Sequence, residues 1–145
     1  MAQTFTVRLL TAGKTVLEAQ VVALQAPGSE GFLGVLAHHA PLVTLLRPGP
    51  LTLTRPDGAR EVFAVSGGFL EVARNWAVVL ADAIERGAEI DLSRAEAARD
   101  RALRRLREQA PGLDSVRAEA ALGRALNRLR VGAGVGAGAE RSGQG

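Results

Sequence analysis

The chain has 145 residues, a formal net charge of +3 and 47% hydrophobic residues. This length suits one domain, or one small domain with an appendage, and the apolar content is sufficient for a core. The absence of cysteine excludes disulfides and thiolate chemistry. The longest apolar stretches are far shorter than the ~20 residues that a membrane helix needs, and the first residues lack the pattern of a signal peptide. We therefore expect a soluble, intracellular protein.

The charge is distributed unevenly along the chain. Residues 1–90 hold seven basic and eight acidic side chains, whereas residues 91–130 hold ten arginines and six acids, and the charges of residues 131–145 cancel. A net charge of −1 in the first segment and +4 in the second predicts that the second segment binds an acidic partner.

Residues 1–89 are predicted to form β-structure. Phe5, Val7 and Leu9 alternate with polar residues, which is the period of a half-buried strand. A second strand is expected over Thr15–Leu24, and Pro27–Gly31 is expected to be a loop. Further short apolar runs bounded by turn residues follow at Phe32–Leu36, Leu42–Leu46, Leu51–Thr54, Glu61–Ser66, Phe69–Ala73 and Ala77–Ala81. Many short strands separated by turn signals predict a sandwich or a barrel.

The sequence pattern changes to a helical period at about residue 90. Asp91 is suited to cap a helix, and apolar residues keep helical spacing from there through Gln109. Pro111-Gly112 is expected to end this helix, and either Asp114 or Ser115 can cap a second one.

The two predicted helices have similar lengths and a short connection, which favours an antiparallel hairpin over residues 90–130. Their apolar stripes are rich in alanine and bury little area, so we expect the hairpin to dock weakly and to be able to open. Residues 131–145 repeat glycine and alanine and are expected to be a disordered tail.

No pattern in the sequence predicts a catalytic or metal site. The only histidines, His38 and His39, are adjacent and would point to opposite faces of an extended segment. Zinc-protease, calcium-loop, phosphate-loop and nucleophile-elbow motifs are all missing from the sequence. Scarce aromatic residues and acids interleaved with the arginines disfavour nucleic-acid binding. The arginines of the helices are then either a solvated face or a partner-binding surface, and both interpretations stand.

Three segments carry a resemblance to a known family. Residues 28–44 (GSEGFLGVLAHHAPLVT) resemble the signature loop of the epsilon subunits of bacterial F-type ATP synthases. Ser66–Val72 together with Val79–Asp82 resemble a second family signature, and Ile90–Ala95 (IDLSRA) resembles a third. The three occur in the family's order, and the resemblance covers residues 4–130.

The resemblance implies both a fold and a function. The fold is a ten-stranded N-terminal β-sandwich (residues 1–89), a C-terminal antiparallel two-helix hairpin (90–130) and a disordered tail (131–145). The function is that of a non-catalytic rotor subunit in the central stalk, which couples rotation of the proton-driven c-ring to ATP synthesis and inhibits ATP hydrolysis through its helices. The sandwich would bind the gamma subunit and the c-ring at the cytoplasmic face of the cell membrane, and no cofactor would be required.

The resemblance also implies particular contact residues. Phe32 and His39 match positions that face the c-ring, and because position 32 is often acidic in relatives, Phe32 would replace a charge pair with packing. When the hairpin extends, a basic face would contact an acidic segment of the catalytic beta subunit, and its residues here are Arg117, Arg124, Arg128 and Arg130. Some family members bind regulatory ATP in the folded hairpin, and the matching residues are Glu85, Asp91, Arg94, Arg101, Arg124 and Arg128. Two of these residues also have simpler explanations: Asp91 as a helix cap, and Arg94 as the ion-pair partner of a nearby acid.

Two alternatives come from other functional classes. A stand-alone nucleotide-binding sensor would bind nucleotide without gamma and would leave the membrane ATPase unaffected. A hydrolase could be built on Asp82, Glu85 and Asp91, although these acids have neither a metal-ligand set nor a nucleophile beside them, and a turnover assay on the purified protein would expose it.

Overall fold

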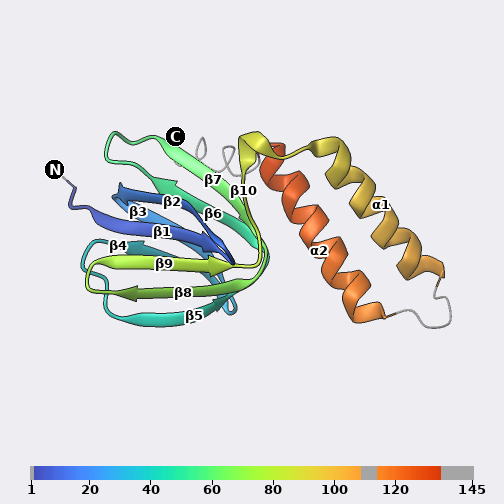
Figure 1. Ribbon diagram of the computed structural model, residues 1–145, viewed down its shortest axis with the longest axis horizontal. Coiled ribbons are helices and arrows are strands. Elements are labelled where there is room, and N and C mark those ends of the chain that lie inside the picture. Colours follow the sequence, from blue (N-terminus) through green and yellow to red (C-terminus); the bar gives the residue numbers. More distant parts are fainter. Residues whose placement is uncertain (1, 109–113, 135–145) are drawn as a thin grey trace. The chain divides into compact units, whose positions relative to one another are not determined.

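The computed structural model describes residues 2–108 and 114–134, in two compact units that divide between Arg86 and Gly87. Within these residues the first unit contains ten strands, and the second contains a short 3-10 turn and two α-helices (Figure 1). The strands are β1 Phe5–Thr11, β2 Lys14–Val21, β3 Ala23–Gly28, β4 Gly31–Leu36, β5 Leu42–Leu46, β6 Gly49–Thr54, β7 Arg60–Val65, β8 Gly68–Ala73, β9 Trp76–Ala81 and β10 Ile84–Arg86. The 3-10 turn is Gly87–Glu89, and the helices are α1 Leu92–Glu108 and α2 Ser115–Gly132.

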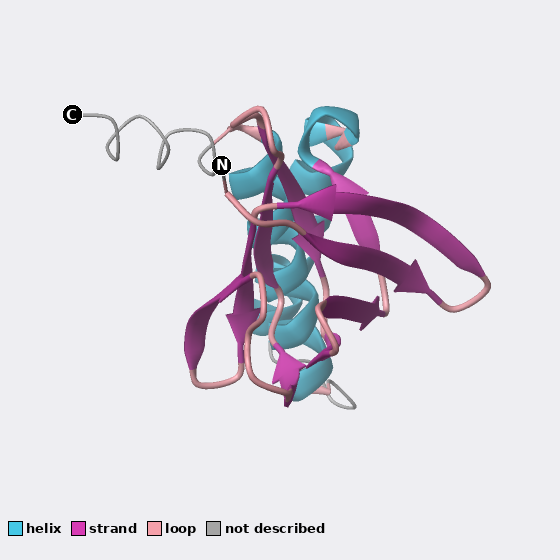
Figure 2. Ribbon diagram, turned by 90° about the vertical axis from the view of Figure 1, so that its left-hand side faces the viewer, coloured by secondary structure: helices cyan, strands magenta, loops and turns pink. Residues whose placement is uncertain are grey.

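The predicted β-sandwich is confirmed. The strands follow one hydrogen-bonded path, β10-β7-β6-β3-β5-β8-β9-β1-β2, with β4 paired to β3. This path folds into two layers, whose strands are magenta in Figure 2. The connection between the layers is narrow, because β3 and β5 pair only at Gly28 and Leu46.

The alternation predicted for the first strand is also confirmed. Phe5, Val7 and Leu9 of β1 are at most 2% exposed, and they lie in one core cluster with large side chains from both layers. That cluster includes Leu24, Leu51, Leu53, Phe63, Leu70 and Val79.

The second strand was predicted wrongly as a single element over Thr15–Leu24. The structure divides it, because β2 ends at Val21 and β3 begins at Ala23. Val21 pairs with Phe5 of β1, whereas the next N–H, that of Val22, donates to the carbonyl of Thr54 at 2.8 Å. The chain therefore changes pairing partner at Val22 while its apolar character continues, and periodicity alone does not reveal such a change.

The loop predicted over Pro27–Gly31 is also wrong in its extent, because only Ser29 and Glu30 form a turn between β3 and β4. Pro27 remains in β3, where its carbonyl accepts the N–H of Arg47 at 2.8 Å. Proline is tolerated at a strand position where the pairing uses its carbonyl oxygen and needs no backbone N–H. The short strand β10 was not singled out by any sequence pattern.

An aspartate caps the N-terminus of each helix. The Asp91 Oδ1 atom accepts the N–H of Arg94 at 3.1 Å, and the Asp114 Oδ1 atom accepts the N–H of Arg117 at 3.1 Å. Asp114, rather than Ser115, therefore caps α2. Figure 1 shows the two helices running antiparallel.

The end of the second helix differs from the expectation. α2 continues through Val131 and Gly132, beyond the boundary predicted at residue 130, and Val131 is only 3% exposed. Burial of this apolar side chain favours continuation of the helix. Gln109, the predicted break at Pro111-Gly112 and tail residues 135–145 lie outside the described residues.

Alanines form the buried seam of the hairpin. Ala95 and Ala102 of α1 and Ala118 and Ala125 of α2 are at most 5% exposed. Leu103 and Leu126, which helical spacing of the apolar residues predicts to face the partner helix, are instead 37% and 43% exposed. Each follows a seam alanine by one residue and so lies about 100° around the helix from it. Because alanine side chains are small, the apolar contact between the helices is thin.

Candidate interaction surfaces

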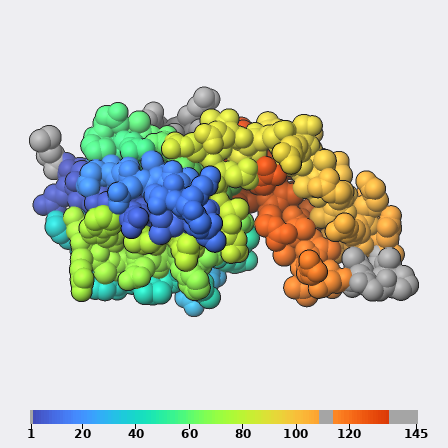
Figure 3. Space-filling view, viewed as in Figure 1, coloured from blue at the N-terminus to red at the C-terminus, as the bar shows by residue number. Residues whose placement is uncertain are grey.

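Large apolar side chains cover the outer surface of one sheet. Leu45 of β5 pairs with Phe69 of β8, which in turn pairs with Leu80 of β9. The three are 56%, 51% and 44% exposed. Val43 and Trp76 are also exposed and lie on the same face, where Val43 pairs with the exposed Glu71 and Trp76 pairs with Ala73. We call these five residues the apolar face. Its strands lie on the near side in Figure 1, and Figure 3 shows the atoms of β8 and β9 in green below those of β1 in blue.

The apolar face is unusual because the same strands also bury their other side. Leu70 and Val72 of β8 and Val79 of β9 are at most 2% exposed. An antiparallel sheet with one face in water usually alternates apolar and polar residues, and a large exposed apolar patch marks a protein or membrane contact. Sequence reasoning missed this surface. Its signal is present in β5 (LVTLL) and β9 (WAVVLA), which are apolar almost throughout, like strands covered on both sides.

The predicted ring-contact residues lie at opposite ends of β4. Phe32 is 59% exposed near the beginning of β4, and His39 follows the turn after its end. A strand rises about 3.3 Å per residue, so the strand portion from Phe32 to Leu36 alone spans about 13 Å. The two side chains therefore do not form one small contact point, and a partner that touches both must cover the length of the strand.

The His39 ring has a defined hydrogen-bond geometry. Its Nδ1 atom lies 2.7 Å from the carbonyl oxygen of Ala40. A carbonyl oxygen only accepts, so Nδ1 is the donor, and in the neutral ring this leaves Nε2 as an acceptor. His39 is thus suited to accept a hydrogen bond from a donor group on a partner.

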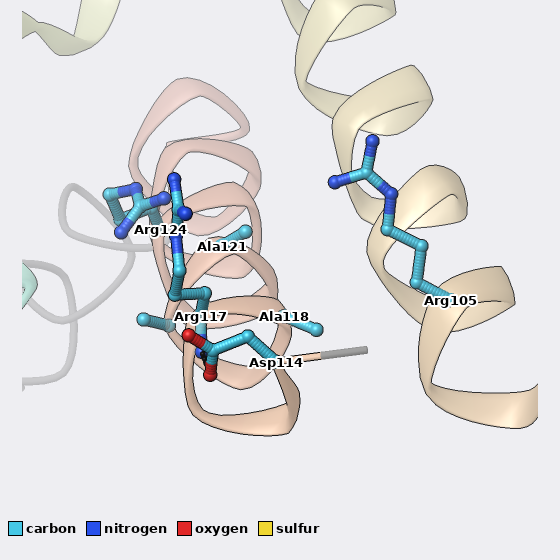
Figure 4. Close-up of a pocket in the computed structure, with 7 residues that line it drawn as sticks. Arg105, Asp114, Arg117, Ala118, Ala121 and Arg124 are labelled. Atoms are coloured by element: carbon cyan, nitrogen blue, oxygen red, sulfur yellow. Dashed lines mark hydrogen bonds between the residues drawn. The ribbon is translucent and has the colours of Figure 1, made fainter. Parts of the chain in front are cut away.

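A groove rich in arginine runs along the helical hairpin. One part, of about 680 Å³, is lined by Arg105 of α1 and by Asp114, Arg117, Ala118, Ala120, Ala121 and Arg124. A second part, of about 250 Å³, shares several of these residues and adds Arg101 and Arg128. Figure 4 shows the side chain of Arg105 projecting from α1 and that of Arg124 from α2, with Ala118 and Ala121 as short side chains on α2.

The groove carries a positive charge. Its lining includes five arginines and one acid, Asp114, whose carboxylate caps α2. Within residues 2–108 and 114–134, Arg101, Arg105, Arg117 and Arg124 form no ion pair. Guanidinium groups over a floor of small side chains suit a phosphate or carboxylate ligand.

Three residues of the predicted ATP-binding set lie together within the helical unit. Arg101, Arg124 and Arg128 line the same groove. Arg94 lies seven residues before Arg101, about two turns along the same side of α1. Asp91 is occupied as the cap of α1, and Glu85 lies on β10 of the sandwich unit.

Of the four arginines predicted to form the basic face of α2, three lie on one side of the helix and the fourth does not. Arg124 and Arg128 follow Arg117 by seven and eleven residues, so all three lie within about 20° of one line along the helix. Arg130 lies about 140° away from Arg117 around the same helix. A flat acidic surface that contacts Arg117, Arg124 and Arg128 would not reach Arg130.

Comparison with known proteins assigns both units. The family model described as the beta-sandwich domain of the ATP synthase Delta/Epsilon chain matches residues 4–87, and the long alpha-helix domain of the same chain matches residues 88–132. The chain belongs to the epsilon-chain family of ATP synthases. The ATP synthase epsilon chain of Moorella thermoacetica is 50% identical over 105 residues, which are 72% of this chain and 78% of that one.

Other epsilon chains show comparable similarity. That of Carboxydothermus hydrogenoformans is 48% identical over 111 residues, covering 77% of this chain and 82% of its own. That of Protochlamydia amoebophila is 43% identical over 98 residues, covering 68% of this chain and 67% of its own. The family resemblance inferred from the three sequence motifs is confirmed.

Two solved structures share the fold. A chain of the Euglena gracilis mitochondrial ATP synthase, in an OSCP/F1/c-ring structure, superposes with a TM-score of 0.75 at 23% identity, covering 86% of this chain and 78% of that chain. A chain of the Tetrahymena thermophila mitochondrial ATP synthase, in a central stalk and c-ring structure, superposes with a TM-score of 0.51 at 21% identity. The match covers 61% of this chain and 70% of that chain. Within the described part of this chain, neither helix has the length and apolar character needed to cross a bilayer.

Proposed function

We propose that this protein is a non-catalytic subunit of the central stalk of a bacterial F-type ATP synthase, peripheral to the cytoplasmic face of the membrane. In this proposal it couples rotation of the c-ring to ATP synthesis and restrains ATP hydrolysis. Membership of the epsilon-chain family supports the assignment, and the apolar face is the observation that carries it, because such a surface marks a contact with another protein or a membrane.

The gamma subunit is the proposed partner of the apolar face. Phe69 lies at the centre of the row between Leu45 and Leu80, and each of the three is about half exposed. Aromatic side chains near the centre of a patch are typical anchors of protein interfaces. Docking of gamma over the row would remove the remaining apolar area from water.

The loop before β5 and the start of β4 are the proposed contacts with the c-ring. Phe32 would contribute apolar packing, and the Nε2 atom of His39 would accept a hydrogen bond from a polar group of the ring. The separation of the two residues along β4 fits a broad rather than a point contact.

The hairpin is proposed to be the regulatory element. In its folded state the arginine groove would bind ATP through Arg101, Arg124 and Arg128. In an extended state Arg117, Arg124 and Arg128 would contact an acidic segment of the catalytic beta subunit. Because Arg124 and Arg128 serve both states, bound ATP would disfavour extension, and the thin alanine seam keeps the two states close in free energy.

The test is ATP hydrolysis by the reconstituted catalytic head with the full-length chain and with a chain cut after Arg86. The cut after Arg86 falls where the two units divide and removes Ile90 together with the helical unit in which it packs, since a Cβ built at Gly132 would lie 3.0 Å from the Ile90 Cγ2 atom. Slower hydrolysis with the full-length chain alone is the expected result.

Two other results would contradict the proposal. Equal hydrolysis with both chains would refute the regulatory part, provided that both bind gamma. ATP binding without any affinity for gamma would favour the stand-alone sensor, which the arginine groove makes the second candidate.

A further inference from the structure

Asn75 occupies a two-residue turn between β8 and β9. Both turn residues, Arg74 and Asn75, have positive φ angles, 54° and 63°. Two consecutive positive φ angles define the tight hairpin turn that matches the twist of the flanking strands, and asparagine tolerates this conformation better than most residues. Turn geometry therefore accounts for an asparagine here, but it does not account for what the side chain contacts.

The Asn75 side chain and backbone bind two distant segments of the chain. Its Oδ1 atom accepts the N–H of His38 at 2.8 Å, and its Nδ2 atom donates to the carbonyl of Thr4 at 3.0 Å. Its own carbonyl accepts the N–H of Thr6 at 3.2 Å. One residue thus joins the start of β1, the β4–β5 connection and the β8–β9 turn, which lie at the same end of the sandwich in Figure 1.

The hydrogen bond to His38 restrains an unfavourable backbone conformation. His38 has a φ of 63°, in the left-handed region that side-chain-bearing residues rarely adopt. The turn that contains it is closed by the N–H of His39, which donates to the carbonyl of Leu36 at 3.2 Å. Such a conformation persists only where the surroundings hold it, and the amide of Asn75 supplies one such restraint from another hairpin.

We propose that Asn75 is a positioning residue for His39. By holding the N–H of His38 it fixes the turn, and the turn fixes the direction in which the His39 ring leaves the sandwich. This inference rests on the proposed contact between His39 and the c-ring. It adds that the contact depends on a residue that itself does not touch the ring.

Three variants separate this role from general stability. Asn75→Gly removes both side-chain hydrogen bonds and still permits a positive φ. Asn75→Asp keeps the acceptor for His38 and loses the donor to Thr4. The control, Arg74→Gly, alters the neighbouring turn residue and leaves both side-chain hydrogen bonds of Asn75 in place.

The first readout is hydrogen exchange of the His38 amide in the isolated chain. Loss of one hydrogen bond predicts exchange that is roughly five- to tenfold faster in Asn75→Gly. The rate should remain close to that of the unmodified chain in Asn75→Asp and in Arg74→Gly. Unchanged exchange in Asn75→Gly would overturn the inference, because the side chain would then not restrain the turn.

The second readout is the affinity of the gamma-bound chain for detergent-solubilised c-ring, measured for Asn75→Gly, His39→Ala and the double variant. We expect both single variants to bind several-fold more weakly, Asn75→Asp and Arg74→Gly to bind normally, and the double variant to bind no more weakly than His39→Ala. Normal binding by Asn75→Gly beside weakened binding by His39→Ala would refute the positioning role alone. Normal binding by His39→Ala would refute the proposed ring contact itself, and the positioning role with it.

Discussion

Replacement of Leu45 by alanine tests whether the apolar face is the docking surface for gamma. Leu45 is 56% exposed, so about half of its side chain remains to be covered by a partner. Leucine to alanine removes three carbon groups at about 0.8 kcal/mol each when they are fully buried. Scaled to the exposed fraction, the loss of binding free energy is about 1.3 kcal/mol, which weakens gamma binding about ninefold.

Leu36→Ala is the matched control for this prediction. Leu36 is 65% exposed on β4, outside the apolar face, so the same atoms are removed from a similarly exposed strand position. Calorimetric titration of gamma into each variant gives the two affinities, and thermal unfolding checks that both variants are folded. Equal weakening by Leu36→Ala and Leu45→Ala, or no weakening by Leu45→Ala, would refute the assignment of this surface.

Three further predictions concern stability and ligand binding. Gly68→Ala should cost more than ~3 kcal/mol of folding free energy, because the new Cβ would lie 2.1 Å from the Leu80 carbonyl oxygen and the residue has a φ of 141°. Gly67→Ala, at a φ of 67° and without such a clash with the backbone, should cost only ~1 kcal/mol. Thermal unfolding measures both, and equal costs would contradict this reasoning. Glu61→Ala should cost ~1–2 kcal/mol, since Glu61 pairs with both Arg55 and Arg86, while Glu18→Ala, at a more exposed pair with Arg8, should cost less than ~0.5 kcal/mol. Denaturant unfolding at low and high salt tests this, and the Glu61 effect should shrink as salt rises. Arg124→Ala should weaken ATP binding, measured by calorimetry, at least ~10-fold. Arg107 does not line the groove, so Arg107→Ala should leave the affinity unchanged. Similar losses of affinity in both variants would exclude the groove as the binding site.

The fold was largely predictable because its elements carry local signals. Phe5, Val7 and Leu9 alternate in sequence and all lie in the core. Asp91 and Asp114 are suitable caps in sequence and act as caps in the structure. The change of pairing partner at Val22 was not predictable, because the new partner β6 lies about 30 residues further along the chain and an alternating apolar pattern suits pairing with either β1 or β6.

The interaction surfaces were harder to predict from the sequence than the fold. Residues such as Phe69 and Leu80 look like core residues, since apolar composition does not distinguish burial in the chain from burial by a partner. The helical period does explain why Arg130 separates from Arg117, because thirteen residues do not complete a whole number of turns. The hydrogen bonds of Asn75 depend on tertiary contacts, and its partners Thr4 and His38 are 71 and 37 residues away.

The parallel pairing of β1 with β9 has a consequence for the order in which the chain folds. Thr6 pairs with Trp76, so β1 gains this neighbour only after the chain is synthesised through β9. Until then β1 has its hairpin partner β2 alone, and its other edge is open to other strands. Pairings this distant in sequence form slowly, whereas the helices that follow pack against their sequence neighbours. During synthesis the sandwich should therefore close late, and the open edge of β1 is available to other strands until β9 has emerged.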